Sequence, residues 1–331
     1  MKNFMILAAC AATFYACSSN DVNTPDINEN TTGLLSVSTS VLTQNSKGTK
    51  APVTGTQLPT GAKIGVFVFN DNTEVAYDGS NINATGSALN QKWTAGETAG
   101  KQTWSASPFT LSIKHADVFA YYPFNDANQS YNAIPVQAGY TDYLVGGHDV
   151  ASHVNGAQPA ATIKLDHALS MISFTFKKGT SYPDACELQK IHFPGLNQAA
   201  TINVKTKAFS AYTGTGDFVV LKHNGGDDYS TITSDAISTE GIGNNKEYHA
   251  LLLPQTGTDT KNVIVRIDNI DYTVSLAHTA TEGNTSDVWA SGRHYTYNLT
   301  LNGGSGQGNQ LIVSSVTVSN WVDGGSSDIP L

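Results

Sequence analysis

The chain has 331 residues, a formal net charge of -9 and only 14% charged residues. The modest acidic excess and the absence of any lysine or arginine cluster exclude nucleic acid as a main partner, because phosphate contacts need clustered basic side chains. Valine, isoleucine, leucine and aromatic residues recur throughout, which excludes a disordered acidic tail as the class of the whole chain.

The N-terminal segment has the pattern of a secretory signal peptide. Lys2 supplies a positive charge, residues 4–15 are mostly apolar, and a polar run follows Cys17. The apolar run is too short to span a bilayer, which takes about 20 apolar residues. A cysteine at the end of such a run predicts lipid attachment at Cys17. Cys10 is the less favoured alternative, because apolar residues continue after it.

A spacer and one isolated strand follow the signal peptide. Residues 18–33 are polar and carry only acidic charges, as a flexible spacer does. Residues 34–43 then alternate between a serine face and a more apolar face, which predicts a half-buried strand. The residues of the apolar face are Leu35, Val37, Thr39 and Val41. A polar, turn-forming stretch with two lysines comes next, so residues 18–50 precede the first confident core strand.

Strand patterns continue to the end of the chain, and no segment after residue 18 has helical periodicity with capping signals. The predicted strands lie at residues 63–69, 109–113, 118–123, 143–146, 161–176, 188–193, 200–204, 218–221, 248–253, 263–267, 272–276, 295–301 and 310–322. With the first strand they number about fourteen, and one sandwich takes about seven. The sequence therefore predicts an all-β fold of two tandem β-sandwich domains, residues 51–160 and 161–331.

Motifs of catalysis are lacking. We find no Gly-x-Ser-x-Gly elbow, HExxH, P-loop or GxGxxG pattern, so we expect no enzyme and no cofactor. His148 and His153, with Asp149 between them, are the nearest approach to a metal site, and a solvated loop is the favoured interpretation. If Cys10 leaves with the signal and Cys17 carries lipid, Cys186 has no disulfide partner, and a packed thiol is favoured over a nucleophile.

Two tryptophans suggest a binding function as an alternative. Trp93 and Trp104 lie in polar surroundings, where their rings could stack on sugars. Packing beneath a loop is the favoured interpretation of both.

Several short pieces of the sequence resemble one known family. The pieces are residues 63–69 (KIGVFVF), 120–124 (AYYPF), 142–146 (DYLVG), 167–172 (HALSMI), 253–254 (LP), 292–299 (GRHYTYNL) and 318–321 (VSNW). In this order, behind a lipoprotein signal, they resemble the fimbrillin-like family of Bacteroidales, the subunits of type V pili. The resemblance covers nearly the whole chain after the signal and implies two domains of transthyretin-like topology.

The resemblance also implies a function in cell adhesion and a mechanism of assembly. A subunit of this family is exported and anchored in the outer membrane as a palmitate-bearing lipoprotein. A trypsin-like protease then removes an N-terminal segment that includes the first strand. The vacated groove accepts a strand from another pilus subunit by β-strand addition, and in known members the C-terminal segment supplies that strand.

This sequence offers a candidate for the removable strand and a candidate for the bond that the protease cuts. The removable strand is the alternating segment before the lysines, and the preferred scissile bond is Lys50–Ala51, with Lys47–Gly48 as the fallback. The best-known members of the family are cut after arginine, whereas the first arginine here is Arg266, so the protease would have to accept lysine.

The candidate donor strand lies in residues 311–322, with Ile312, Val316 and Val318 as its apolar residues. The glycine-rich residues 302–308 before it are a candidate hinge. The alternative is that residues 311–322 form only the last strand of their own domain. The alternative function for the whole chain is a surface lipoprotein that binds a glycan or host ligand, as an adhesin or pilus tip.

Overall fold

The computed structural model describes residues 31–41, 57–78, 88–128, 130–149, 154–182, 186–225, 228–243, 247–256, 262–276, 287–304, 307–320 and 326–329. Every regular element in these ranges is a β-strand, which confirms the all-β prediction. None of the described residues forms a helix that could cross a membrane.

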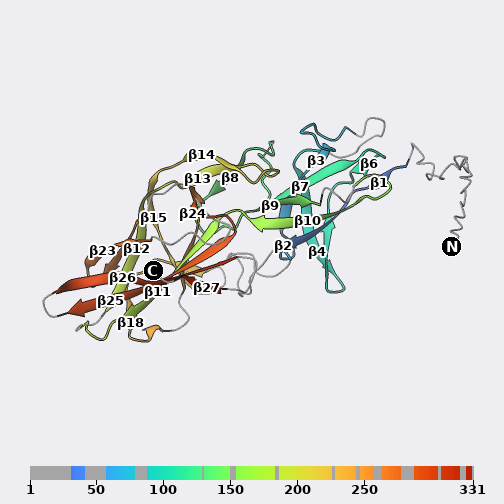
Figure 1. The fold of residues 1–331 in the computed structure, drawn as a ribbon. Coiled ribbons are helices and arrows are strands. Elements are labelled where there is room, and N and C mark those ends of the chain that lie inside the picture. Colours follow the sequence, from blue (N-terminus) through green and yellow to red (C-terminus); the bar gives the residue numbers. More distant parts are fainter. Residues whose placement is uncertain are drawn as a thin grey trace, which may run out of the picture.

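A seven-stranded sheet lies at one end of the molecule (Figure 1). Its spatial order is β2 (Ser36–Val41), β10 (Ala160–His167), β9 (Leu144–His148), β7 (Ala116–Tyr122), β3 (Lys63–Asn70), β4 (Gln91–Thr98) and β5 (Lys101–Ser105). β1 (Gly33–Leu34) and β6 (Thr110–Leu111) form a separate small pair. The sheet therefore joins β2, near the start of the described residues, to β10 from the middle of the chain.

The other end of the molecule is a sandwich of two sheets. The first sheet has the order β17 (Asp228–Ser230), β16 (Lys222–Gly225), β20 (Glu247–Leu252), β11 (Ser170–Lys178), β25 (Arg293–Gly304), β26 (Gln307–Asn320) and β27 (Ser326–Ile329). The second has the order β19 (Gly241–Ile242), β18 (Asp235–Ser238), β12 (Glu187–Leu196), β22 (Asn262–Ile267) and β23 (Ile270–Ser275), with β15 (Gly216–Val219) also paired to β12. Their facing side chains form one core, which includes Phe174, Phe193 and Trp289.

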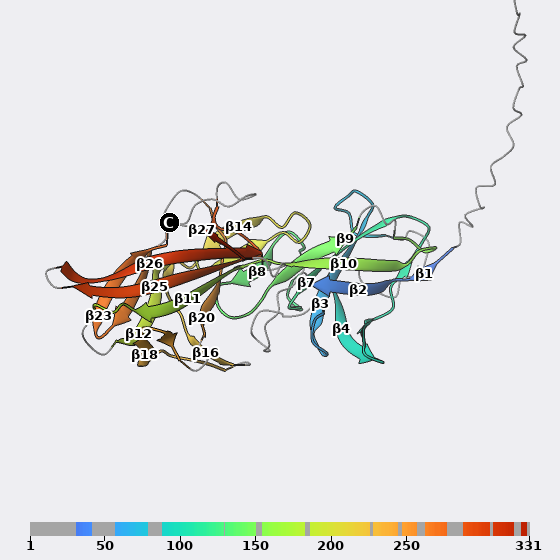
Figure 2. The same cartoon turned by 60° about the horizontal axis from the view of Figure 1, so that its bottom comes forward.

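A separate core, called the joining core below, lies between the two ends of the molecule. Phe67 and Phe119 of the seven-stranded sheet pack with Ile202 and with Leu251 of β20. β8 (Ile134–Gln137), β13 (Ala199–Ile202) and β14 (Phe209–Thr213) form a three-stranded sheet here, between the two ends in both views (Figures 1 and 2). β21 (Gln255–Thr256) pairs with β24 (Asp287–Trp289). The division into two tandem domains stays a prediction.

The central strand β3 shows why the sequence reads as a strand buried on both faces. Ile64, Val66 and Val68 point into the core inside the seven-stranded sheet. Phe67 and Phe69 point to the opposite face and into the joining core. All five side chains are buried, which is the pattern expected of a continuous apolar strand.

The long apolar run at residues 161–176 is two strands rather than one. β10 pairs with β2 and β9, whereas β11 pairs with β20 and β25, so the chain changes sheet between His167 and Ser170. Ala168 donates its N–H to the carbonyl of Tyr143 at 2.7 Å, and Leu169 is buried in the joining core. The expected domain boundary near residue 160 lies at the start of β10.

Cys186 is buried, with 3% of its surface exposed. Burial, with a further contribution from Asp268, raises the pKa of its thiol from 9.0 to about 11. At pH 8 this lowers the thiolate fraction about a hundredfold, and the thiolate is the reactive form. In a chain that starts at Ser18, a thiol reagent is expected to label no cysteine in the folded protein and Cys186 in urea. Rapid labelling of the folded chain would contradict the buried, inert thiol.

Candidate functional site

The predicted first strand forms the edge of the seven-stranded sheet. β2 lies within the expected segment 34–43 and pairs in parallel with β10, from Ser36 opposite Ala160 to Val41 opposite Leu165. Only β10 pairs with it among the described strands. An edge strand leaves one row of backbone groups for other partners, and its removal would expose the corresponding row on β10.

β2 and Leu35, the residue directly before it, also close a core. Leu35, Val37 and Val41 are 6%, 8% and 1% exposed and pack into the core that contains Ile163 and Val66. Burying a valine or leucine side chain contributes about 1.5–3 kcal/mol, so the three together contribute about 5–9 kcal/mol. Removing β2 would therefore uncover an apolar groove.

The groove that β2 fills is bordered by β5 as well as by β10, because a hydrogen bond joins β2 to β5. β2 and β5 are the two edges of the sheet, yet Thr39 of β2 donates from Oγ1 to Oε1 of Gln102 on β5 at 3.0 Å. Gln102 also donates from Nε2 to the carbonyl of Leu58 at 2.6 Å. The sheet is thus curled, and β2 fills the space between its neighbour β10 and the opposite edge strand β5.

The proposed processing features lie outside the described residues. These are the lipidation site Cys17 and the scissile bonds Lys50–Ala51 and Lys47–Gly48. The structure does describe both flanks of the lysine-containing segment. β2 ends at Val41, and the chain is described again from Gln57, followed by the buried Leu58.

The candidate donor residues lie in β26, which pairs with β25 on one side and β27 on the other. Val316 and Val318 are buried in the sandwich core, whereas Ile312 is 42% exposed. The ladder skips Ser314, and this bulge puts Ile312 on the other face from Val316 and Val318. In this structure, β26 is a strand of its own sheet.

The glycine-rich segment predicted as a hinge is mostly strand. β25 extends to Gly304 and β26 begins at Gln307, so the segment is the tip of a hairpin. Asn302 pairs with Gln310 and Gly304 with Gln307. The ladder between β25 and β26 therefore extends into the glycine-rich residues, which the periodicity of the flanking sequence does not predict.

Comparison with known proteins identifies the fold and the family. A sequence model of the fimbrillin-like family matches residues 49–321, which is most of the chain. The chain belongs to the fimbrillin-like family. Membership implies a cell-surface fimbrial subunit that assembles with other fimbrial subunits. No curated protein sequence matches it.

Solved structures share the fold of this fimbrillin-like chain. A candidate cell adhesion protein from Bacteroides uniformis is 18% identical with a TM-score of 0.55, and the match covers 87% of this chain and 98% of that one. A candidate cell adhesion protein from Bacteroides ovatus is 17% identical with a TM-score of 0.55, covering 88% and 99%. At these identities the likeness shows the fold.

Four of the sequence pieces that resemble the family come together where the chain changes sheet. The Asp142 carboxylate lies 2.9 Å from Nδ1 of His167, and both side chains are buried. Leu169, two residues after His167, and Leu253 belong to the same joining core. Gly292 donates its N–H to the carbonyl of Leu169 at 2.9 Å. These residues hold the seven-stranded sheet at one end of the molecule against the sandwich at the other end.

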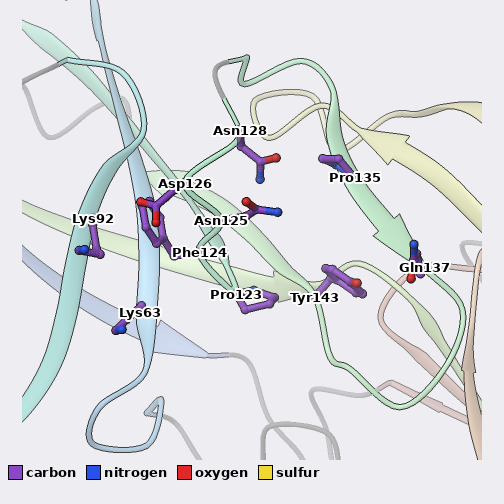
Figure 3. Close-up of a pocket in the computed structure, with 10 residues that line it drawn as sticks. All are labelled: Lys63, Lys92, Pro123, Phe124, Asn125, Asp126, Asn128, Pro135, Gln137 and Tyr143. Carbon is purple, nitrogen blue, oxygen red and sulfur yellow. The ribbon is translucent and has the colours of Figure 1, made fainter.

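A polar hollow of about 560 Å³ opens beside the same joint (Figure 3). Its lining residues are Lys63, Lys92, Pro123, Phe124, Asn125, Asp126, Asn128, Pro135, Gln137 and Tyr143. The ammonium group of Lys92 lies 5.7 Å from the centre of the Phe124 ring. Burial raises the pKa of Tyr143 above its usual value, which already lies well above neutral pH, so the phenol keeps its proton.

The two tryptophans proposed for sugar stacking belong to the core. Trp93 is 4% exposed and donates from Nε1 to Oε1 of Gln91 at 2.9 Å. Trp104 is partly buried and packs against the same core. The favoured interpretation, packing, therefore holds for Trp93, because β4 turns this side chain into the core and away from any sugar.

Only His148 of the candidate metal pair lies among the described residues. His148 is buried, and its Nδ1 accepts the N–H of Val118 at 3.0 Å, a bond within the sheet. His153 lies outside the described residues. Asp149 directly follows β9.

Proposed function

We propose that this chain is a structural fimbrial subunit that polymerises by strand exchange after a protease removes its first strand. The observation that carries the proposal is the position of β2, which fills the gap between its neighbour β10 and the opposite edge strand β5 and covers an apolar core. The lysine-containing segment follows β2 directly in the sequence. Cleavage there would cut the covalent link between β2 and the rest of the sheet.

Another subunit's strand would then refill the groove. Main-chain hydrogen bonds to β10 would provide binding, and alternate apolar side chains would replace those of Leu35, Val37 and Val41. We propose residues 311–322 as the donor, with Val316 and Val318 among the inserted side chains. They can act as a donor only if β26 leaves β25 and β27. We therefore infer that the release of β26 from its own sheet is coupled to its insertion into the groove of another subunit.

We also propose that lipid at Cys17 anchors the precursor at the outer membrane until cleavage. The alternative role, a surface protein that binds a glycan through tryptophans, receives less support because Trp93 is buried. A polymerising subunit accounts for the covered edge strand, whereas a glycan-binding protein has no need for one.

Trypsin treatment of a chain that starts at Ser18 is expected to cut after Lys50 or Lys47 and to produce multimers. Replacing both lysines with glutamine should preserve the monomer, because residues 42–56 then contain no lysine or arginine at which trypsin can cut. Lys101→Gln, an exposed lysine on β5, is the control and should still assemble. Size-exclusion chromatography and N-terminal sequencing read the result. A cleaved chain that stays monomeric would count against the proposal.

A further inference from the structure

Among the described residues, three side chains that bind metals come together at one edge of the C-terminal sandwich. They are His223 on β16 and Glu247 and His249 on β20, and one ligand atom from each lies within 4.8 Å of the others. β16 and β20 pair antiparallel with His223 opposite Glu247. His249 is two residues after Glu247, so the alternation of β20 puts both on the same face.

The distances fit a small cation. Oε2 of Glu247 lies 3.2 Å from Nδ1 of His223 and 3.8 Å from Nδ1 of His249. Ligand atoms about 2.0–2.2 Å from a tetrahedral zinc ion lie roughly 3.3–3.5 Å apart. The Glu247 side chain is 61% exposed, so its carboxylate has room for the small adjustment.

A buried nitrogen points to a missing ligand. Nδ1 of His249 has no hydrogen-bond partner, although its side chain is only 2% exposed. Nε2 of the same ring lies 3.1 Å from the hydroxyl of Tyr229. If Nε2 carries the proton and donates to that hydroxyl, Nδ1 presents its lone pair to Glu247 and His223. An orienting partner on the second ring nitrogen is typical of histidines that bind metals.

Aromatic packing fixes the rings. The His223 ring stacks on Tyr229 with centroids 4.8 Å apart, and Tyr229 lies 4.3 Å from the Tyr140 ring. The Tyr140 hydroxyl accepts the N–H of Leu221 at 2.6 Å, close in sequence to His223. The two imidazoles are therefore held in place before an ion arrives, which lowers the ordering required on binding.

We propose that His223, Glu247 and His249 bind one divalent transition-metal ion, with Zn²⁺ as the best match to two imidazoles and a carboxylate. Three protein ligands leave the fourth tetrahedral position to water. The ion would tie β16 to β20, next to the edge strand β17. This proposal does not depend on strand exchange, because none of its residues lies in β2, β10 or β26.

Calorimetric titration of the purified full chain with ZnCl₂ tests the site. We expect about one Zn²⁺ per chain at this site and a higher melting temperature with Zn²⁺ than with EDTA. Tyr229→Phe removes only the hydrogen-bond partner of a ligand, so it should weaken Zn²⁺ binding roughly 10–100-fold. His249→Ala and Glu247→Gln each remove a ligand atom, so each should weaken Zn²⁺ binding by more than that. Glu247 is exposed, so Glu247→Gln keeps the test valid if His249→Ala fails to fold.

His115→Ala is the matched control. His115 also faces a carboxylate, with Nδ1 4.0 Å from Oδ2 of Asp71, but belongs to no group of three metal-binding side chains among the described residues. This variant should bind Zn²⁺ as the parent chain does. Equal Zn²⁺ affinity in the parent and Glu247→Gln chains, or no binding by the parent, would overturn the site and leave a histidine–carboxylate ion pair only.

Discussion

A disulfide between positions 38 and 162 is expected to block assembly of the cleaved chain, and a reductant is expected to restore it. Ser38 of β2 and Thr162 of β10 are register partners, and the Ser38 hydroxyl donates to Oγ1 of Thr162 at 3.1 Å. Both side chains are exposed, so a reductant can reach the bond. Neighbouring strand positions of this kind meet the separation that a disulfide needs.

The expected loss of assembly can be calculated from the covalent attachment of β2 to β10. A strand that stays covalently attached competes with incoming strands at an effective concentration of about millimolar, so micromolar subunits should assemble on the order of 10²–10³-fold less. The experiment treats the Ser38→Cys, Thr162→Cys chain with trypsin and compares oxidised and reduced samples by size-exclusion chromatography. The chain with Ser38→Cys alone, kept alkylated, is the control. Equal assembly before and after reduction would show that β2 need not leave.

Gly146→Ala is expected to destabilise the sheet on which β2 docks by about 3 kcal/mol or more. A Cβ at Gly146 would meet the carbonyl oxygen of Lys164, lie 2.8 Å from the carbonyl carbon of Lys164 and lie 3.1 Å from Cα of Leu165. These are backbone atoms of β10, which cannot move aside as a flexible side chain does. The ladder between β9 and β10 must shift instead.

Urea unfolding followed by tryptophan fluorescence measures this loss. Gly308→Ala is the matched control, because Gly308 also lies in a strand and a Cβ there meets no described atom within 4 Å. That variant should unfold at nearly the urea concentration of the parent chain. Equal midpoints for both variants would contradict the close approach of β9 and β10.

The apolar pattern of the sequence predicts the central strands well. β3 and β7 contain the apolar runs at residues 64–69 and 118–122, and burial on both faces is what such runs require. β4 and β5 are missed, because segments such as Lys101–Ser105 are polar and alternate only weakly. Strands of this kind are held by pairing with a neighbour, which a local pattern does not contain.

The candidate site is only partly visible in the sequence. The alternation at Leu35, Val37 and Val41 predicts a strand with one buried face, and the structure buries all three side chains. Its partner cannot be predicted from alternation, because β2 pairs with β10, more than a hundred residues away along the chain. The same limit hides the group at His223 and His249, which the pairing of β16 with β20 brings together.

The donor segment shows a third limit. Strict alternation puts Ile312, Val316 and Val318 on one face, but the bulge at Ser314 turns Ile312 outward. A bulge adds one residue to one strand and reverses the faces beyond it, and the serine-rich sequence around it gives little sign of its position. The face that a donor strand presents therefore depends on its partner.

The N-terminal residue of the subunit in fimbriae isolated from the cell surface tests strand removal most directly. Sequencing or mass spectrometry of the assembled subunit should find Ala51, or Gly48 for the fallback bond, with residues 35–41 absent from the polymer. A polymer whose subunits begin at a lipidated Cys17 and retain β2 would contradict removal of the first strand.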